Sequence, residues 1–408
     1  MPKKLLKKIK NSPIKQAVIL CGGIGSRLGN ITKKTPKPLI EIGKKPFLDY
    51  LIDNLIKYEV ERILLLCSYK SNKFFKKYHN KKINKLTKII CIDEKKQLGT
   101  GGAIINAKKK LDDYFYLING DTFFEGDLFQ LNENFDRTKY DVIIASQKIY
   151  NERYGSIELR NDIVKKFNVD KKKKLSNINL GTYIINKKIL NKYKKIKISL
   201  ENNILPDLTK RKKIQCFSYE KKFFIDIGIK KDLQKAKKIL PKIKYPTVFL
   251  DRDGVINLNL GYVSKIKNFH FTKNIFKAIK YFNRKNYLVF IVTNQSGIGR
   301  GYYTEKKMKD LHLWMKKKFK NNLCRIDDIF YAPYYKFSNK YSLKEHYNLR
   351  KPNIGMYNLA LKKWPIDKKK LIMIGDSEID LIFGKKINAK TIIVKENKDI
   401  FKQILKFV

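Results

Sequence analysis

The sequence predicts an α/β protein with two domains, and three observations support this fold class. The chain has 408 residues, and at about 100–200 residues per domain this length suggests two domains. Strand-like and helix-like patterns alternate through both halves, which is typical of mostly parallel sheets. Two apolar strands, Ala17–Leu20 and Val248–Leu250, each run directly into a loop rich in glycine or aspartate. Because ligands bind at the carboxyl ends of parallel strands, we expect one site after each of them.

Short apolar runs separated by helical patterns, such as Phe47–Lys57 and Glu305–Lys318, give the order of the elements. The expected strands are Ala17–Leu20, Ile63–Cys67, Ile89–Ile92, Tyr116–Ile118, Val142–Ala145 and Thr182–Ile185, then Val248–Leu250, Leu288–Val292, Ile329–Tyr331, Leu371–Ile374 and Thr391–Val394. Residues 1–13 are expected to be a loose basic tail, and two prolines mark a linker at 241–246. The predicted domains therefore span residues 14–240 and 247–408.

The charge of the chain is strongly positive, with 91 Lys and Arg against 37 Asp and Glu, a net +54. A basic face is typical of nucleic-acid binding, but these lysines are spread along the whole chain and indicate a solvated surface. We expect no specific nucleic-acid partner. No apolar run reaches the ~18 residues of a membrane span, and the basic start lacks the apolar core of a secretory signal. Five scattered cysteines without a C-x-x-C pair favour a reducing cytoplasm.

The loop after the first strand, LCGGIGSRLG (20–29), contains four glycines and one arginine. Glycines allow backbone N–H groups to approach phosphate oxygens closely, and Arg27 can neutralise charge that develops on a leaving pyrophosphate. The loop is not a P-loop, because no G-K-[ST] follows. It also lacks the dinucleotide fingerprint, because Leu28 stands at the third glycine position.

Four further segments of the first half point to nucleotide chemistry. Lys37 lies between two prolines, which hold a cation in a rigid loop. QLGTGGA (97–103) is a second flexible loop that can offer backbone groups to a base edge. Asp121 in NGDTFF follows a strand, and Asp226 in FIDIG supplies a second carboxylate, so the pair is suited to Mg²⁺.

In this order the five motifs resemble the sugar-1-phosphate nucleotidyltransferases over residues 14–235. Within that family, NGDTFF and FIDIG are similar to the corresponding sequence motifs of the heptose-1-phosphate guanylyltransferases. The resemblance implies a Rossmann-like, GT-A-like sheet with Mg²⁺ on Asp121 and Asp226. It implies that Arg27 contacts the triphosphate and that Lys37 stabilises the transferred α-phosphoryl group. The implied substrate-binding residues are Gly22, Gly23 and Gly25 at the triphosphate, Gln97 and Gly101, and Glu158, Asn179 and Gly181 at the sugar.

One stretch departs from that family. Relatives carry F-x-E-K near a lysine that grips the sugar phosphate, whereas this chain reads FNVDKKKKLSN at 167–177. Which of Lys171–Lys174 takes that role stays open. Cys21 also stands where alanine is usual, and we interpret it as a small buried thiol.

In the second half, FLDRDGVIN (249–257) ends a strand with two aspartates, Asp251 and Asp253, that can face the same way. One carboxylate can attack phosphorus and the other can protonate the leaving oxygen. A divalent metal must screen their repulsion from a phosphate dianion, and Asp376 supplies a further anionic ligand. Thr293 and Lys351 follow in order as a hydroxyl donor and a compact cation.

These motifs resemble the haloacid-dehalogenase phosphatases over residues 246–400, and most closely the D-glycero-D-manno-heptose 1,7-bisphosphate phosphatases, with histidinol phosphatases next. The resemblance implies a Rossmannoid domain with a minimal cap. It implies that Asp251 is the nucleophile, that Asp253 is the acid/base, and that Thr293 and Lys351 stabilise the phosphoryl group. Mg²⁺ is implied on Asp251, the Asp253 carbonyl and Asp376. The implied substrate-binding residues are Asn259, Gly261, Tyr262, Asn294, Gln295, Ser296, Arg350 and Ser377.

Relatives of this second family often carry a Cys/His zinc loop just before the motif RKP, which is residues 350–352 in this chain. The matching positions here are Ala332, Tyr334, Tyr347 and Leu349, and His346 alone cannot hold zinc. We therefore expect no structural zinc. We expect tyrosines to pack this loop instead, namely Tyr331, Tyr334, Tyr335, Tyr341 and Tyr347.

A 1,7-bisphosphate that loses its 7-phosphate leaves a sugar 1-phosphate, the nucleophile that a nucleotidyltransferase needs. The expected partners are therefore sugar phosphates and a nucleoside triphosphate, with GTP favoured by the resemblance. Three alternatives stay open: a mannose or glucose 1-phosphate transferase fused to another sugar or histidinol phosphatase, a nucleic-acid end-processing phosphatase, and one inactive domain. The base, the anomer and the oligomeric state are also open.

Overall fold

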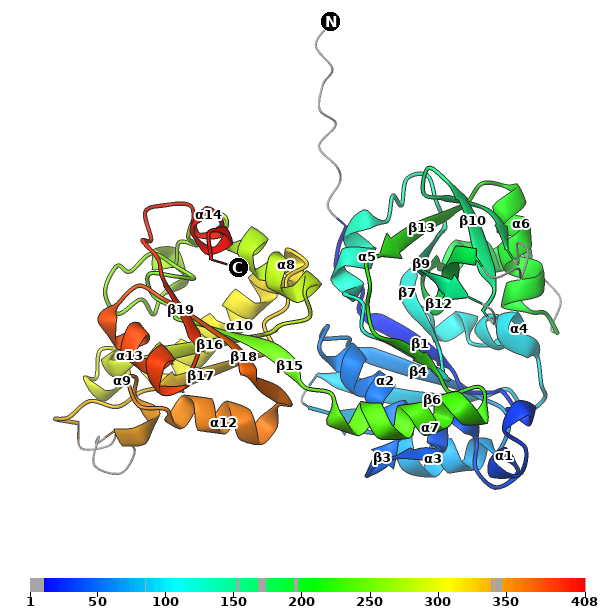
Figure 1. The fold of residues 1–408 in the computed structure, drawn as a ribbon, viewed down its shortest axis with the longest axis horizontal. Helices are drawn as coiled ribbons and strands as arrows, with labels where there is room; N and C mark the ends of the chain where they lie inside the picture. The colour runs from blue at the N-terminus through cyan, green and yellow to red at the C-terminus, as the bar shows by residue number, and fades with distance from the viewer. Residues whose placement is uncertain are drawn as a thin grey trace, which may run out of the picture. The chain divides into compact units, whose positions relative to one another are not determined.

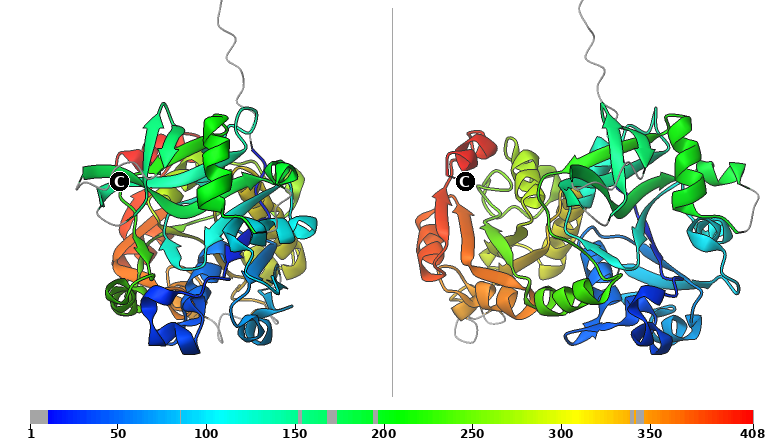
Figure 2. Two further views of the ribbon diagram at one scale, coloured as in Figure 1. Left: turned by 90° about the vertical axis from the view of Figure 1, so that its right-hand side faces the viewer. Right: turned by 45° about the vertical axis from the view of Figure 1, so that its right-hand side comes forward.

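The computed structural model describes residues 11–84, 86–151, 154–167, 174–193, 197–338, 341 and 347–407, except for the side chains of Asn151, Lys174 and Tyr347. Its contacts divide the chain into two units, Met1–Lys242 and Ile243–Val408, each built around one large sheet (Figure 1, with two further views in Figure 2). Each expected strand overlaps an observed one, and the two expected helices are α2 (Phe47–Ile56) and α10 (Glu305–Asn321). Among the described residues, no helix combines the length and apolar character that crossing a membrane requires.

A tail and a linker are expected to border the first domain, and the division between the two units falls inside the expected linker 241–246. Residues 1–10 of the expected tail lie outside the described residues. Asn11 is held on the domain, because its side-chain amide donates to the carbonyls of Asn132 at 2.6 Å and Phe135 at 2.7 Å. At the other end, Leu240–Lys242 form a 3-10 helix and the next strand already starts at Tyr245. The segment 241–246 is therefore occupied largely by regular structure.

The first unit contains a ten-stranded mixed sheet. Its order is β10 (Ser156–Arg160), β11 (Ile163–Phe167), β13 (Ile214–Tyr219), β9 (Val142–Asn151), β12 (Lys174–Asn186), β7 (Tyr114–Asn119), β1 (Gln16–Leu20), β4 (Arg62–Cys67), β6 (Thr87–Asp93) and β5 (Lys82–Ile83). β7, β1, β4 and β6 form a continuous parallel block of four strands, and β13 and β9 form a separate parallel pair. The expectation of a mostly parallel sheet is wrong here, because β12 runs antiparallel to both of its neighbours, β7 and β9.

The parallel block positions the first site. The chain leaves β1, moves outward to β4 and β6, and then returns to β7 on the other side of β1. The loops after β1 and β7 therefore leave the sheet in different directions, and such a switch point opens a crevice at the strand ends. The glycine loop follows β1 and Asp121 follows β7.

Helices close the faces of this sheet. In α2, apolar residues recur every three or four positions and are buried, and Pro46 precedes the helix. On one face, α4 (Gly99–Asn106) and α6 (Leu205–Lys210) contribute to the core beside β1, β4 and β7. The other α-helices described in this unit are α1 (Asn30–Lys34), α3 (Ser71–Tyr78), α5 (Leu128–Asn134) and α7 (Lys230–Ile239). Four short strands form two separate two-stranded sheets: β2 (Glu41–Ile42) with β3 (Lys45–Pro46), and β8 (Thr122–Phe124) with β14 (Phe224–Asp226).

The second unit has a five-stranded sheet in which every neighbouring pair is parallel, as expected. Its order is β17 (Asp328–Ala332), β16 (Leu288–Asn294), β15 (Tyr245–Leu250), β18 (Ile366–Gly375) and β19 (Lys390–Ile393). One face is covered by α8 (Ile275–Arg284), α10 and α14 (Ile400–Leu405), and the other by α12 (Gly355–Lys363) and α13 (Glu378–Lys386). The described part of this unit contains no second sheet that could form a large cap.

Two candidate active sites

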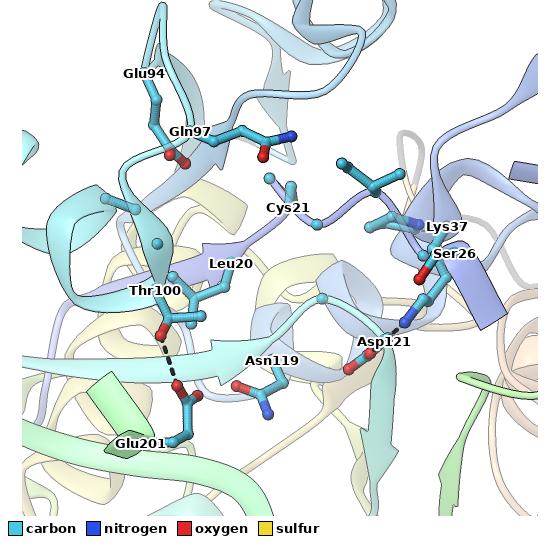
Figure 3. Close-up of a pocket in the computed structure, with 18 of the residues that line it drawn as sticks. Leu20, Cys21, Ser26, Lys37, Glu94, Gln97, Thr100, Asn119, Asp121 and Glu201 are labelled. Atoms are coloured by element: carbon cyan, nitrogen blue, oxygen red, sulfur yellow. Dashed lines mark hydrogen bonds and ion pairs between the residues drawn. The ribbon is translucent and has the colours of Figure 1, made fainter. Parts of the chain in front are cut away.

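The first candidate site is a cavity of about 550 Å³ at the ends of β1 and β7 (Figure 3). Of the residues predicted for this domain, Gly22, Gly23, Gly25, Lys37, Gln97 and Asp121 line it. The cavity wall also contains residues that sequence reasoning missed, among them Glu94, Thr100, Asn119, Lys197 and Glu201. The glycine loop therefore faces a hollow large enough for a ligand.

An ion pair crosses the floor of this cavity. Lys37 begins the 3-10 helix Lys37–Leu39, directly after Pro36, and its Nζ lies 2.8 Å from Oδ2 of Asp121 (Figure 3). The lysine is buried, whereas a quarter of the Asp121 side chain is exposed. The cation is thus held at the end of β7 and close to the glycine loop, because Gly25 packs against the Lys37 side chain.

The two predicted magnesium ligands lie at one end of the β8–β14 pair, where Asp121 directly precedes β8. Asp226 ends β14 and pairs with Thr122 in β8, and the Ile227 N–H donates to the Asp121 carbonyl at 2.9 Å. Carboxylate oxygens are the ligands that Mg²⁺ prefers, so the donor chemistry fits this ion. Asp121 lines the cavity, whereas Asp226 lies beside it without forming part of the wall.

Arg27 does not line the cavity in this structure. It lies in the 3-10 turn Ser26–Leu28, where Leu28 is the buried residue and Arg27 is exposed. Its neighbour Ser26 does line the cavity. The expected contact of Arg27 with a triphosphate therefore stays a prediction.

The segment QLGTGGA lines the cavity with four of its residues and also packs against another part of the chain. Gly102 N–H donates to the Ile198 carbonyl at 3.0 Å, and Ile198 N–H donates to the Leu98 carbonyl at 2.9 Å. A Cβ at Gly101 would lie 3.0 Å from the Ile198 oxygen and 2.8 Å from Cδ1 of Ile204. Gly101 is therefore closely packed and does not line the cavity, so its assignment to substrate binding stays a prediction.

Thr100 connects this segment to the opposite wall. Its hydroxyl donates to Oε2 of Glu201 at 2.6 Å and accepts from the Leu200 N–H at 2.9 Å (Figure 3). The Ser199 hydroxyl donates to the same carboxylate oxygen at 3.1 Å. These bonds fix Glu201 at the cavity wall. Nothing in the sequence signals this role, because Glu201 stands in a segment without a recognisable pattern.

The residues predicted for the sugar pocket do not line the cavity. Glu158 is exposed on β10, and Asn179 is bonded within β12, where its Nδ2 donates to the Tyr183 hydroxyl at 2.7 Å. Gly181 makes room for Asn119, because a Cβ there would lie 2.8 Å from Nδ2 of that side chain. Asn119 does line the cavity, and its buried Oδ1 is one of the few atoms without a partner among the described residues. Of the candidate lysines at 171–174, Lys171–Lys173 lie outside the described residues, as does the Lys174 side chain.

The second candidate site is a cavity of about 320 Å³ at the ends of β15, β16 and β18. It lies at the switch point of this sheet, because the chain moves from β15 to β16 and β17 and then returns to β18. Every residue predicted for this domain lines the cavity: Asp251, Asp253, Asn259, Gly261, Tyr262, Thr293, Asn294, Gln295, Ser296, Arg350, Lys351, Asp376 and Ser377. Tyr303, Ile379 and Asp380 complete the wall.

A buried lysine organises the acidic groups. Nζ of Lys351 lies 2.9 Å from Oδ1 of Asp251 and 2.6 Å from Oδ1 of Asp380, and Asp380 is fully buried. Sequence reasoning missed Asp380, although it stands four residues after Asp376 in GDSEID, one helical turn away. Its second oxygen accepts from the Ser377 hydroxyl at 2.8 Å.

The acidic cluster is suited to a divalent cation. Asp251, Asp376 and Asp380 each offer an oxygen, and these atoms lie within 4.8 Å of one another. Burial and the charge of Asp380 raise the pKa of Asp376 to about 6, and burial also raises the pKa of Asp251 against the opposing charge of Lys351. One lysine does not balance three carboxylates, so oxygen donors and excess negative charge both fit Mg²⁺.

Gly254 allows this cluster to form. It has φ +85°, and a Cβ there would lie 1.9 Å from Oδ2 of Asp376. The position therefore requires glycine both for its backbone conformation and for space.

Asp253 is held by side chains from three directions. Arg252 donates from Nη2 to its two oxygens at 3.0 and 2.8 Å, Asn257 donates at 2.9 Å, and Gln295 donates at 3.1 Å. Gln295 also donates to the Thr293 hydroxyl at 2.8 Å and accepts from the Tyr303 hydroxyl at 2.8 Å. Asp253 and Thr293 are thus linked through one amide.

Arg252 is a residue that sequence reasoning missed. It is fully buried, does not line the cavity, and donates to the Val263 carbonyl at 2.9 Å. Its Nη1 lies 3.3 Å from Nε2 of His312, whose pKa is lowered to about 3 by burial and by the arginine charge. A neutral imidazole therefore supports the guanidinium that holds Asp253.

Tyrosines pack the loop after β17. The hydroxyls of Tyr331 and Tyr341 both donate to Glu305, the second at 3.0 Å, and the rings of Tyr334 and Tyr341 lie 6.5 Å apart. Glu305 accepts these bonds as a carboxylate, since Lys309 and the tyrosine hydroxyls lower its pKa to about 2. His346 lies outside the described residues.

Comparison with known proteins places both units in enzyme families. The nucleotidyl transferase family matches residues 16–242, and the HAD-hydrolase-like family matches residues 348–403. The D-glycero-alpha-D-manno-heptose-1,7-bisphosphate 7-phosphatase of Campylobacter jejuni is 39% identical over 165 residues, which are 40% of this chain and 91% of that protein. The D-glycero-alpha-D-manno-heptose 1-phosphate guanylyltransferase of the same organism is 36% identical over 219 residues, 53% of this chain and 96% of that protein.

A solved structure is similar to the first unit in both sequence and fold. The crystal structure of HddC from Yersinia pseudotuberculosis is 35% identical with a TM-score of 0.51, and the match covers 56% of this chain and all of that one. The same protein complexed with GMP-PN matches with a TM-score of 0.50. The chain thus joins regions similar to two separate enzymes.

Proposed function

The chain belongs to the nucleotidyl transferase family through its first unit and carries a haloacid-dehalogenase-like hydrolase domain in its second, and from this premise we propose two consecutive reactions on one sugar phosphate. The second unit removes the 7-phosphate of D-glycero-D-manno-heptose 1,7-bisphosphate. The first unit then transfers GMP from GTP to the heptose 1-phosphate, which gives GDP-heptose and pyrophosphate. The observation that carries the proposal is that the chain spans 91% of a relative named for the first reaction and 96% of one named for the second.

In the phosphatase step, Asp251 attacks the phosphorus of the 7-phosphate. Its recorded contacts within the described chain, from Lys351 Nζ and the Arg252 N–H, are both to Oδ1, so Oδ2 is the oxygen available for attack. The bond from phosphorus to the sugar oxygen breaks, and Asp253 donates a proton to that oxygen. Water then attacks the aspartyl phosphate, Asp253 takes its proton, and inorganic phosphate leaves.

The surrounding groups stabilise charge during this step. Lys351 and the Thr293 hydroxyl contact the phosphoryl oxygens, and Arg350 and Tyr262 at the cavity wall contact the sugar. Asp251, Asp376 and the Asp253 carbonyl would hold Mg²⁺, which would supply the positive charge that lets a carboxylate approach a phosphate dianion.

In the transfer step, an oxygen of the heptose 1-phosphate attacks the α-phosphorus of GTP and pyrophosphate leaves. Backbone N–H groups at Gly22, Gly23 and Gly25 hold the phosphates, and Lys37 stabilises the charge on the α-phosphoryl group. Arg27 follows the cavity residue Ser26 and contacts the leaving pyrophosphate. Asp121 and Asp226 hold the Mg²⁺ that balances the triphosphate charge.

A substrate panel tests the proposal. The purified full chain is incubated with heptose, mannose and glucose phosphates and bisphosphates, each with every common NTP, and phosphate and pyrophosphate release are followed separately. We expect phosphate from the heptose 1,7-bisphosphate, and pyrophosphate from heptose 1-phosphate with GTP. Preferred pyrophosphate release from mannose or glucose 1-phosphate, or preferred phosphate release from 3′-phosphorylated DNA, would contradict it.

A further inference from the structure

The loop Asn259–Tyr262 carries three residues of the second cavity wall, Asn259, Gly261 and Tyr262, yet all four of its residues are exposed. Gly261 and Tyr262 have φ values of +71° and +47°. A tyrosine rarely adopts this left-handed conformation, because its Cβ then crowds the backbone. An exposed loop with such a backbone keeps its shape only when contacts from elsewhere hold it.

The hydrogen bonds within this loop are local. The Leu260 N–H donates to the Leu258 carbonyl at 3.1 Å, and the Gly261 N–H donates to Oδ1 of Asn259 at 3.4 Å. Each of these bonds joins residues that are only two positions apart. They shape the turn itself, but they do not fix where the turn lies relative to the cavity.

A carboxylate from a distant part of the sequence holds the start of the loop. The Asn259 N–H donates to Oε2 of Glu396 at 2.5 Å, although the two residues are 137 positions apart. Glu396 is partly buried and lies between β19 and α14. A backbone N–H bonded to an ionised carboxylate forms a charge-assisted hydrogen bond, which is stronger than one between neutral groups. This bond connects the loop to the segment that follows the edge strand β19.

The segment that carries Glu396 is itself fixed. The Gln403 side chain in α14 donates to the Lys395 carbonyl at 2.9 Å and accepts from the Lys395 N–H at 2.9 Å. The N-cap of α14 is Asp399, whose carboxylate accepts from the Lys402 N–H at 3.0 Å and from the Asn274 side chain at 2.6 Å. Glu396 therefore follows a residue that α14 holds at both backbone groups, so it can serve as a firm anchor.

We propose that Glu396 is a positioning residue of the second site, which holds the loop Asn259–Tyr262 at the cavity and thereby sets how tightly the sugar part of the substrate binds. Glu396 does not line the cavity, so it acts through the loop and not by touching the substrate. The inference rests on the proposed function, because it requires that Tyr262 contacts the sugar. Asp251 and Lys351, which act on the phosphoryl group, lie outside the loop.

Two substrates separate this role from a general effect on folding. The heptose 1,7-bisphosphate contacts the loop through its sugar, whereas p-nitrophenyl phosphate has no sugar and relies on the groups around the phosphate. In Glu396→Ala we expect KM for the bisphosphate to rise about fivefold with kcat nearly unchanged, because one hydrogen bond to a charged group is lost. The kcat/KM for p-nitrophenyl phosphate should stay at the wild-type value, which also shows that the variant is folded.

Glu396→Gln removes the charge but keeps an oxygen that can accept from the Asn259 N–H. It should recover most of the lost affinity, and this separates the hydrogen bond from the charge. Glu378→Ala is the matched control, because it removes an exposed carboxylate that stands between the cavity residues Ser377 and Ile379 without lining the cavity itself. Its kinetic constants for both substrates should equal those of the wild-type chain.

An unchanged KM for the bisphosphate in Glu396→Ala, or an equal loss of activity with both substrates, would overturn the inference. Neither result would contradict the proposed function, which requires only that the wild-type chain releases phosphate from the bisphosphate. If the wild-type chain hydrolyses p-nitrophenyl phosphate but not the heptose bisphosphate, the proposed function fails. KM of Glu396→Ala is then compared with wild type on the sugar phosphate that the chain prefers, and an unchanged KM there overturns the inference as well.

Discussion

The two cavities occupy the same place in their sheets but differ in the residues that line them. In each unit the chain starts at a central strand, moves outward over two strands, and returns to the other side of the first, as in β1, β4, β6 and β7 and in β15, β16, β17 and β18. The first cavity is lined by five glycines and by five charged side chains, two of which, Lys37 and Asp121, form an ion pair. The second is lined by four aspartates, a lysine and an arginine.

This difference separates two ways of handling phosphate. In the second unit charged side chains hold one another in place, and in the proposed reaction one of them, Asp251, forms a bond to phosphorus. In the reaction proposed for the first unit, main-chain N–H groups and charged side chains only have to hold and stabilise a group that passes between two substrates. Single substitutions should therefore have much larger effects on the second site than on the first.

Asp251→Asn is expected to have the largest effect. An amide is a poor nucleophile, so phosphate release should fall by roughly 10⁴-fold or more. Nucleotidyl transfer from supplied heptose 1-phosphate should stay unchanged, because Asp251 belongs to the other unit. Both rates are measured on the same preparation. Loss of both activities in a folded variant would show that the two sites depend on each other.

Arg252→Met should lower phosphate release by about 10²-fold. The arginine does not reach the substrate, but without it Asp253 loses the two Nη2 contacts that orient its carboxylate. We therefore expect kcat to fall with little change in KM, and Arg252→Lys, which keeps the charge, to lose less.

Arg350→Met provides the contrast to Arg252→Met, because Arg350 lines the cavity and should mainly raise KM. Steady-state kinetics with the bisphosphate measure both constants. A rise of KM alone in Arg252→Met would contradict its role in positioning Asp253.

The second site could be predicted from the sequence because its chemistry is carried by side chains in short patterns at strand ends. Asp251, Thr293 and Asp376 each follow an apolar run, and parallel strands bring such positions together. Arg252 and Asp380 were missed because their roles depend on burial, which a pattern of charged residues does not reveal. The buried ion pair between Lys351 and Asp380 is seen only in the structure.

The first site could be predicted only in outline. The glycine loop, Lys37 and Asp121 lie where expected, but a glycine in a sequence does not show whether it makes room for a ligand or for another segment. Gly101 makes room for Ile198, and Gly181 makes room for Asn119. The antiparallel pairing of β12 was missed because its apolar run, Thr182–Ile185, looks the same as that of a buried parallel strand.

A pair of alanine substitutions separates the two kinds of glycine. Gly101→Ala should lower the free energy of unfolding by about 1–3 kcal/mol, because its Cβ overlaps Ile198 and Ile204. Gly23→Ala should leave stability unchanged, since nothing lies within 4 Å of its Cβ, and should raise KM for GTP about tenfold by obstructing the phosphates. Urea unfolding and pyrophosphate release measure the two effects. Equal loss of stability in both variants would remove the distinction between packing and binding glycines.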